Sequence, residues 1–224
     1  MTDLTNQHAP NHRFAALLSE ASRPRALQDT VLLQTSEWVA APSLGALVPG
    51  WLVIIPRCPA LNYRDWARRG DDPTRLLDEA AALLGLTRAD YVWFEHGPQA
   101  ERTLVGCGVD YAHLHMLIQP PFRGADLVNA AAADADAGLT WTPIQRADAY
   151  AEAAADNSYF TVGQGDEAWV ATDVDAAGSQ YLRRTVANLL DQPMSWNYRT
   201  HPQAENIVST IELVEVLRVP SVAA

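Results

Sequence analysis

The sequence contains no lysine, and all 16 of its basic residues are arginine. This absence excludes Walker-type phosphate loops, Schiff-base catalysis and a lysine general base, because each of these depends on a lysine amine. The only two cysteines, Cys58 and Cys107, form neither a CxxC pair nor a disulfide framework. No apolar run approaches the ~20 residues of a membrane-spanning helix, and the N-terminal segment lacks the apolar stretch of a secretory signal. These absences predict a soluble, cytoplasmic protein.

Positive charge is also scarce, because 27 acidic residues outnumber the basic ones and give a net charge of -11. A phosphate backbone would on average be repelled, which argues against a general nucleic-acid-binding protein. A small anionic ligand remains compatible with this charge if arginines gather locally. The hydrophobic content of 48% predicts a sizeable buried core.

Strand and helix patterns alternate irregularly along the chain. Period-2 or continuously apolar segments predict strands over residues 31–35, 38–41, 51–56, 91–95, 111–118, 159–162 and 168–172. Helical spacing predicts helices over residues 14–21, 75–86, 180–190 and 204–217, with a surface helix and loop over 124–138. Too few strand–helix–strand units are present for a doubly wound sheet, so we expect an α+β domain built on an antiparallel sheet with flanking helices. The expected organisation is a disordered lead (1–12), a core (13–123) and an extension packed on it (124–224), within one domain overall.

The most informative segment is Tyr111-Ala112-His113-Leu114-His115-Met116-Leu117-Ile118. On a strand, Tyr111, His113, His115 and Leu117 share one face, and the apolar residues between them face the core. The two histidines would then lie about 7 Å apart along the strand, on its solvent side.

Three interpretations of this pair compete. The histidines are surface residues, or they bind a metal ion with His96 as the third ligand, or His113 is a nucleophile that attacks phosphorus while His115 holds phosphate oxygens. In the third case Gly106, Cys107 and Gly108 would bring backbone N–H groups to the phosphate, with the Cys107 thiol itself structural. His96 is either a loop histidine or a wall of the phosphate site.

The segment 111–117 resembles the alternating pattern of the histidine-triad superfamily, with tyrosine in place of the first histidine. Residues 44–57 are similar to the family's upstream strand, where Pro-Gly-His usually stands in place of Pro49-Gly50-Trp51. Residues 94–97, 106–110, 179–184 and 196–199 resemble segments of a bacterial branch of the same superfamily, so the likeness covers residues 25 to 212.

The resemblance implies a histidine-triad-like fold, a homodimer, and a nucleotide hydrolase or nucleotidylyltransferase that acts at an α-phosphate through a covalent nucleotidyl-histidine intermediate. In this alignment His113 is the nucleophile, His115 assists it, and the hydroxyl of Tyr111 borders the phosphate and helps to orient the histidines. A second register, with His115 as nucleophile, would leave Leu117 at a position where an anion-binding group is expected.

The resemblance also favours Gln180 and Arg183 as ligands of the phosphate, although a solvated helix face is the common explanation of such residues. The expected ligand is a small nucleotide-containing substrate. No cofactor is required, although magnesium would be compatible with a polyphosphate substrate. Two alternatives stay open, which are a non-catalytic nucleotide-binding module and an HxH metalloenzyme.

Overall fold

An eight-stranded sheet, in which every pair of neighbouring strands is antiparallel, forms the centre of the protein. The computed structural model describes residues 13–18, 26–70, 72–151 and 156–218. The strands are β1 (Leu33–Gln34), β2 (Trp38–Pro42), β3 (Trp51–Pro56), β4 (Tyr91–Gly97), β5 (Leu114–Ile118), β6 (Trp141–Gln145), β7 (Tyr159–Gln164) and β8 (Glu167–Thr172). Their order in the sheet is β1-β2-β3-β5-β4-β7-β8-β6, so β5 lies near the middle.

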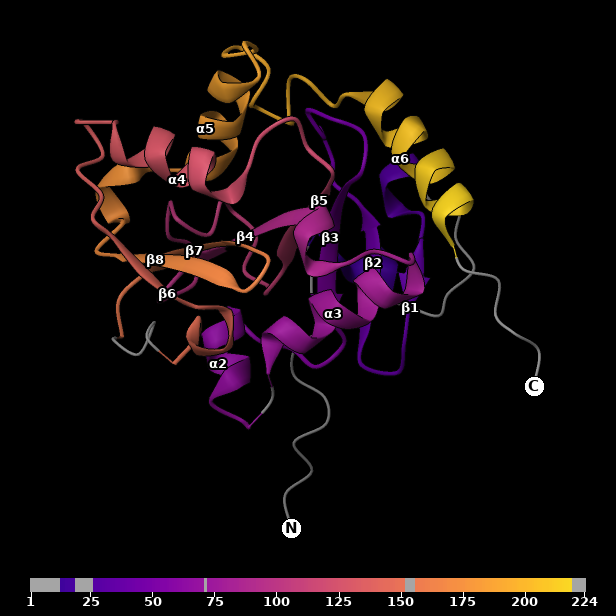
Figure 1. Ribbon diagram of the computed structural model, residues 1–224, viewed down its shortest axis with the longest axis horizontal. Coiled ribbons are helices and arrows are strands. Elements are labelled where there is room, and N and C mark those ends of the chain that lie inside the picture. Colours follow the sequence, from indigo (N-terminus) through magenta and orange to yellow (C-terminus); the bar gives the residue numbers. More distant parts are fainter. Residues whose placement is uncertain (1–12, 19–25, 71, 152–155, 219–224) are drawn as a thin grey trace.

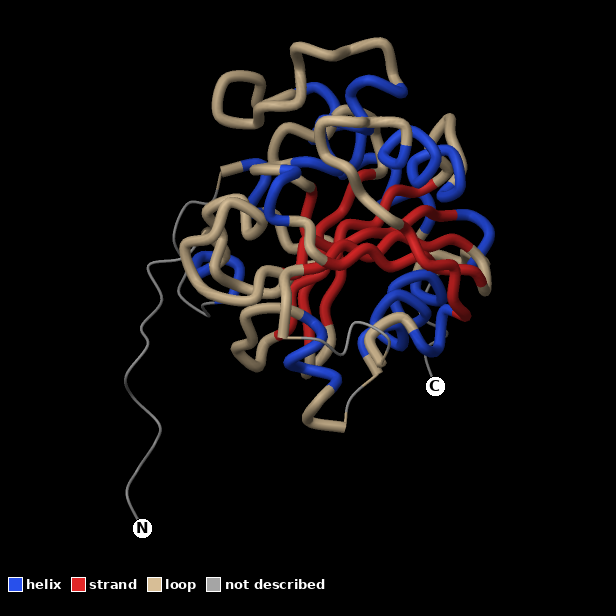
Figure 2. Tube along the Cα trace, turned by 90° about the vertical axis from the view of Figure 1, so that its left-hand side faces the viewer, coloured by secondary structure: helices blue, strands red, loops and turns tan. Residues whose placement is uncertain are grey.

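Helices cover both faces of this sheet. They are α1 (Ala15–Leu18), α2 (Tyr63–Ala67), α3 (Pro73–Leu83), α4 (Gly124–Ala132), α5 (Tyr181–Leu189) and α6 (Ala204–Leu217). In Figure 1, α4 and α5 lie on one side of the sheet, and α2 and α3 lie on the other. Figure 2 shows the strands as a twisted central layer between helices. The expected α+β fold with flanking helices is therefore confirmed. Among the described residues, no helix is long and apolar enough to cross a membrane.

The alternation of side chains along β5 separates two hydrophobic layers. Leu114, Met116 and Ile118 pack in one layer with residues of α2 and α3. Leu117 packs in the other layer, which contains residues of α4 and α5. A third, smaller cluster, which we call the α1 cluster, packs Leu17 of α1 against residues of β2 and β3. It lies on the same face of the sheet as α5. The predicted core face of the strand is confirmed.

The expectation that the histidine face of this strand meets solvent is wrong. β5 pairs with β3 on one side and with β4 on the other, and all five of its residues are buried. His115 therefore lies on a covered face, whereas His113, which directly precedes the strand, is half-buried. The strand also begins at Leu114, three residues later than the pattern 111–118 predicts.

The other elements follow the sequence predictions to differing degrees. Residues 51–56 and 204–217 form a strand and a helix with the bounds predicted. The helix predicted over 75–86 begins earlier and ends at Leu83, and Gly85 follows it with a φ of 66°. The helix predicted over 14–21 covers Ala15–Leu18, and the remainder of that prediction, like the lead over 1–12, lies outside the described residues. Among the α-helices and strands of the described residues, α2 and β6 were not predicted.

Candidate functional site

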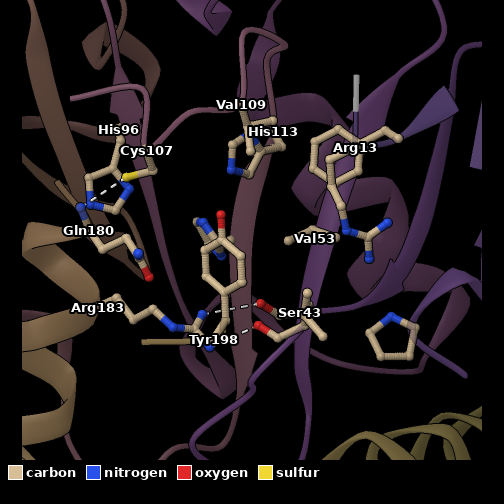
Figure 3. Close-up of a pocket in the computed structure, with 14 residues that line it drawn as sticks. Arg13, Ser43, Val53, His96, Cys107, Val109, His113, Gln180, Arg183 and Tyr198 are labelled. Atoms are coloured by element: carbon tan, nitrogen blue, oxygen red, sulfur yellow. Dashed lines mark hydrogen bonds between the residues drawn. The ribbon is translucent and has the colours of Figure 1, made fainter. Parts of the chain in front are cut away.

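An open cleft lies over the histidine face of β5. The residues that line it are Arg13, Phe14, Pro42, Ser43, Leu44, Val53, His96, Cys107, Val109, His113, His115, Gln180, Arg183 and Tyr198. In Figure 3, His96, Cys107, Gln180 and Arg183 form one side and Arg13, Val53 and Ser43 the other, with Tyr198 between them. Of the nine site residues predicted from the sequence, the structure brings six to this cleft.

His113 is held by the main chain of its own segment. Its Nδ1 lies 2.9 Å from the carbonyl oxygen of Tyr111. Because a carbonyl oxygen can only accept, Nδ1 carries the proton and Nε2 is left with the ring's lone pair. Burial lowers the pKa of His113 from its ordinary value, although the bond to the Tyr111 carbonyl opposes the shift. His113 is therefore neutral at neutral pH, with a nucleophilic nitrogen.

His115 has the opposite tautomer. The indole N–H of Trp51 donates to Nδ1 of His115 over 3.0 Å, so Nδ1 holds the lone pair and Nε2 carries the proton. The ring stacks on Phe94 at a centroid distance of 4.5 Å and lies 5.0 Å from the ring of His113. Burial first, and then the neighbouring His113 and His96, lower the pKa of His115 well below 6.5. His115 is thus a neutral hydrogen-bond donor.

His96 is a strand residue of β4, and the interpretation of it as a loop histidine is wrong. Its Nε2 accepts from the backbone N–H of Leu182, in the first turn of α5, over 3.2 Å. Nδ1 therefore carries the proton. The ring lies 6.1 Å from that of His115, and burial lowers the pKa of His96 to about 3. His96 forms a wall of the cleft as a second neutral donor.

The side chain of Tyr111 does not border the cleft, which corrects the sequence expectation. Its hydroxyl donates to the carbonyl oxygen of Pro56 over 2.9 Å, and its ring packs in the α1 cluster. Burial raises the pKa of Tyr111 to about 12. The contact of this residue with His113 is made by its carbonyl group, which any amino acid supplies at this position. The orientation of His113 therefore does not depend on the side chain at position 111 through this contact.

The glycine-flanked turn at residues 106–108 also differs from expectation. The backbone N–H groups of Gly106 and Cys107 are engaged inside the turn, by Thr103 Oγ1 and the Leu104 carbonyl, and are not directed at the cleft. Neither Gly106 nor Gly108 lines the cleft, whereas Cys107 does. The Cys107 sulfur accepts the backbone N–H of Gln180 over 3.0 Å, and burial raises the pKa of its thiol. Its role is to hold the start of α5.

Gln180 and Arg183 are buried, so the solvated-face interpretation of this helix is wrong for both. Gln180 has a positive φ of 56°, and its buried Oε1 has no hydrogen-bond partner within the described part of the chain. A non-glycine residue in this conformation with an unsatisfied buried atom is typical of a ligand-binding position.

The guanidinium of Arg183 joins the C-terminal segment to the loop after β2. It donates to the carbonyl oxygens of Trp196 (2.8 Å) and Leu44 (2.9 Å), to that of Gly45, and to Ser43 Oγ over 3.4 Å. Burial lowers the pKa of Arg183 to about 10, which still leaves it cationic at neutral pH. Among its partners in the described residues there is no carboxylate, so its charge favours an anion in the cleft.

Sequence reasoning missed the other eight residues that line the cleft, with Phe14, Ser43 and Tyr198 among them, and also Trp51, which donates to His115 from beside it. Phe14 contacts the His113 ring edge-on at 5.1 Å. Tyr198 comes from the segment between α5 and α6 and packs on Gly45, where an added Cβ would lie 2.6 Å from the Cβ of Tyr198. These contacts join residues far apart in sequence, and no local pattern indicates them. Two positions carried a signal: Trp51 departs from the Pro-Gly-His pattern of the resembled family, and Tyr198 lies in the resembled segment 196–199.

Among the described residues, the cleft therefore presents one imidazole lone pair that accepts no hydrogen bond, two imidazole N–H donors and a buried cation. None of the described residues that line it is acidic, and the described part of the chain holds no group of three or more His, Cys, Asp or Glu side chains that could bind a metal ion. This arrangement suits nucleophilic attack on an anionic electrophile. In comparisons with known proteins, the sequence matches no protein-family model and shows no significant match to a curated protein.

Proposed function

We propose that this protein is a nucleotide hydrolase or nucleotidylyltransferase of the histidine-triad type, in which Nε2 of His113 attacks an α-phosphorus. The observation that carries the proposal is the bond from His113 Nδ1 to the Tyr111 carbonyl, which leaves Nε2 unprotonated in a cleft with a buried arginine. The likeness of residues 111–117 to the histidine-triad pattern supplies the substrate class.

In the proposed first step, the Nε2 lone pair forms a bond to phosphorus while the bond from phosphorus to the leaving group breaks. The leaving group departs with that electron pair and takes a proton from solvent. The imidazole ring becomes positively charged, and the Tyr111 carbonyl stabilises this charge through Nδ1–H. Water or an acceptor hydroxyl then forms a bond to phosphorus and gives its proton to solvent, while the P–N bond breaks and its electron pair returns to Nε2.

The charge that develops on the phosphoryl oxygens would be met by neutral N–H donors. His115 supplies Nε2–H and His96 supplies Nδ1–H, and Arg183 contributes its positive charge from within α5. Such fixed donors are effective in a buried site because they need not reorganise during the reaction. The register with His115 as nucleophile is disfavoured, since its lone pair already accepts the Trp51 N–H.

The metalloenzyme alternative is disfavoured by the same lone pairs. A neutral histidine binds a metal through its single lone pair. Those of His115 and His96 accept from Trp51 and Leu182, so only His113 offers one to an ion. Magnesium would enter with a polyphosphate substrate, bound through the phosphates. The binding-module alternative differs from our proposal in turnover alone, and the following experiment separates the two.

The test is a screen of nucleotide esters, anhydrides and phosphoramidates with wild type, His113→Ala and His115→Ala. His201→Ala, which changes an exposed histidine outside the cleft, is the control. We expect wild type and His201→Ala to turn over at least one substrate and His113→Ala to lose activity without losing its thermal transition. Mass spectrometry after an alkaline quench, chosen because P–N bonds hydrolyse in acid, should find a nucleotidyl adduct on His113. Activity retained in His113→Ala, or binding without turnover in wild type, would overturn the proposal.

A further inference from the structure

Trp51 is the first residue of β3 and is fully buried beside the cleft. Its indole ring lies edge-on to the rings of Phe94 and His115, each at 5.8 Å between centroids. The guanidinium carbon of Arg183 sits 4.6 Å from the centre of the indole. The ring is therefore held from several sides, and its N–H is aimed at His115 Nδ1.

We infer that Trp51 is a positioning residue, which fixes His115 as a hydrogen-bond donor through Nε2. An indole nitrogen can only donate. A proton on His115 Nδ1 would therefore face the proton of the indole, so this contact excludes both the other neutral tautomer and the imidazolium ion. The register of the sheet holds the contact in place, since Trp51 pairs with Leu117 in the β3–β5 ladder.

The consequence for the site is a division of roles between two similar histidines. The rings of His113 and His115 are 5.0 Å apart, and without fixed tautomers either could present a lone pair to a ligand. The Tyr111 carbonyl assigns the lone pair on Nε2 to His113, and the Trp51 indole assigns the proton on Nε2 to His115. The meaning of this division for catalysis rests on the proposed function, whereas the tautomer of His115 does not.

The tautomer can be measured by ¹⁵N NMR of histidine- and tryptophan-labelled protein at neutral pH, with His115 signals assigned by their loss in His115→Gln. In wild type we expect an unprotonated Nδ1, a protonated Nε2, and a coupling through the hydrogen bond between Trp51 Nε1 and His115 Nδ1. In Trp51→Phe we expect a mixture of both tautomers. Trp38→Phe is the matched control, because Trp38 is equally buried and donates its indole N–H to Glu79 on the other face of the sheet.

A proton on His115 Nδ1 in wild type, or an unchanged tautomer in Trp51→Phe, would refute the inference. If Trp51→Phe does not fold, the coupling between Trp51 Nε1 and His115 Nδ1 in wild type is the test. Its absence, with both nitrogen signals resolved, would also refute the inference. With an active substrate in hand, Trp51→Phe should lower kcat about tenfold to a hundredfold, as loss of a partner that orients a site histidine does. The NMR result stands without turnover, so a failure of the proposed function is distinguishable from a failure of this inference.

Discussion

Glu95 and His96 are consecutive residues of β4 whose side chains lie on opposite faces of the sheet. Glu95 is buried, and its carboxylate accepts from the backbone N–H of Tyr63 and the hydroxyl of Tyr159, each over 2.8 Å. Burial raises the pKa of Glu95 to about 7 and lowers that of His96 to about 3. We therefore expect the substitutions Glu95→Gln and His96→Gln to change the pH dependence of stability in opposite directions.

The sign and size follow from the linkage between protonation and folding. A histidine with a lowered folded-state pKa stabilises the protein above 6.5 and loses this contribution as the pH falls toward 3. On going from pH 8 to pH 5, the protonation of His96 in the unfolded state should thus lower the free energy of unfolding by about 2 kcal/mol. A carboxyl group with a raised pKa stabilises most below 4.5 and loses this as the pH rises through 7. Over the same change from pH 8 to pH 5, Glu95 should contribute a gain of about 2–3 kcal/mol.

The assay is urea unfolding at pH 8, 7, 6 and 5, with each variant compared to wild type at every pH. On going from pH 8 to pH 5, Glu95→Gln should lose about 2–3 kcal/mol more stability than wild type, and His96→Gln about 2 kcal/mol less. Glu215→Gln and His201→Gln, at exposed positions, should follow wild type. If His96→Gln follows wild type as well, or if both variants shift in the same direction, the reasoning about buried neutral histidine and buried carboxyl is refuted.

Two further substitutions test the geometry of the site. Tyr111→Phe should keep kcat/KM within about twofold of wild type and lower the free energy of unfolding by about 1 kcal/mol, because the hydroxyl donates to the Pro56 carbonyl and not into the cleft. A tenfold loss of kcat/KM in a rate assay would show that the hydroxyl acts in the site. Arg183→Ala should lower the free energy of unfolding by about 2–4 kcal/mol in urea titrations, since buried carbonyls lose their donors. Arg184→Ala is the control, because Arg184 donates to a single carbonyl oxygen, that of Ala177. An equal loss of unfolding free energy in Arg184→Ala would contradict the role of Arg183 in joining the C-terminal segment to the loop after β2.

The sequence predicted the fold best where one segment carries its own pattern. The apolar run Trp51–Pro56 and the helical spacing of Ala204–Leu217 suffice to set the bounds of β3 and α6. By contrast, β6 contains Pro143, which usually interrupts a strand, and it is tolerated here because β6 lies at the edge of the sheet. That position depends on pairing with β8, which residues 141–145 alone do not indicate.

The sequence predicted six of the residues that line the cleft, but it did not predict how deeply His115 is buried or where the side chain of Tyr111 lies. Polar residues at alternate strand positions usually indicate a solvent face, yet His115 is buried because the rings of Trp51 and Phe94, from the two neighbouring strands, pack against it. Tyr111 was placed beside His113 by extending strand alternation backward. The chain adopts strand geometry only from Leu114, so the alternation does not reach residue 111. An alternating sequence pattern does not indicate at which residue a strand begins to pair with its neighbours.

The cleft is lined by residues from Arg13 to Tyr198, and the N–H of Gly50 donates to Thr210 Oγ1 across 160 positions of sequence. Closing such long loops costs chain entropy before any of the stabilising contacts form, and this cost slows folding. The cleft therefore cannot assemble on the ribosome until almost the whole described chain has emerged. In refolding experiments, ligand binding should return with or after the last structural signal and never before it, which makes the cleft a late reporter of complete folding.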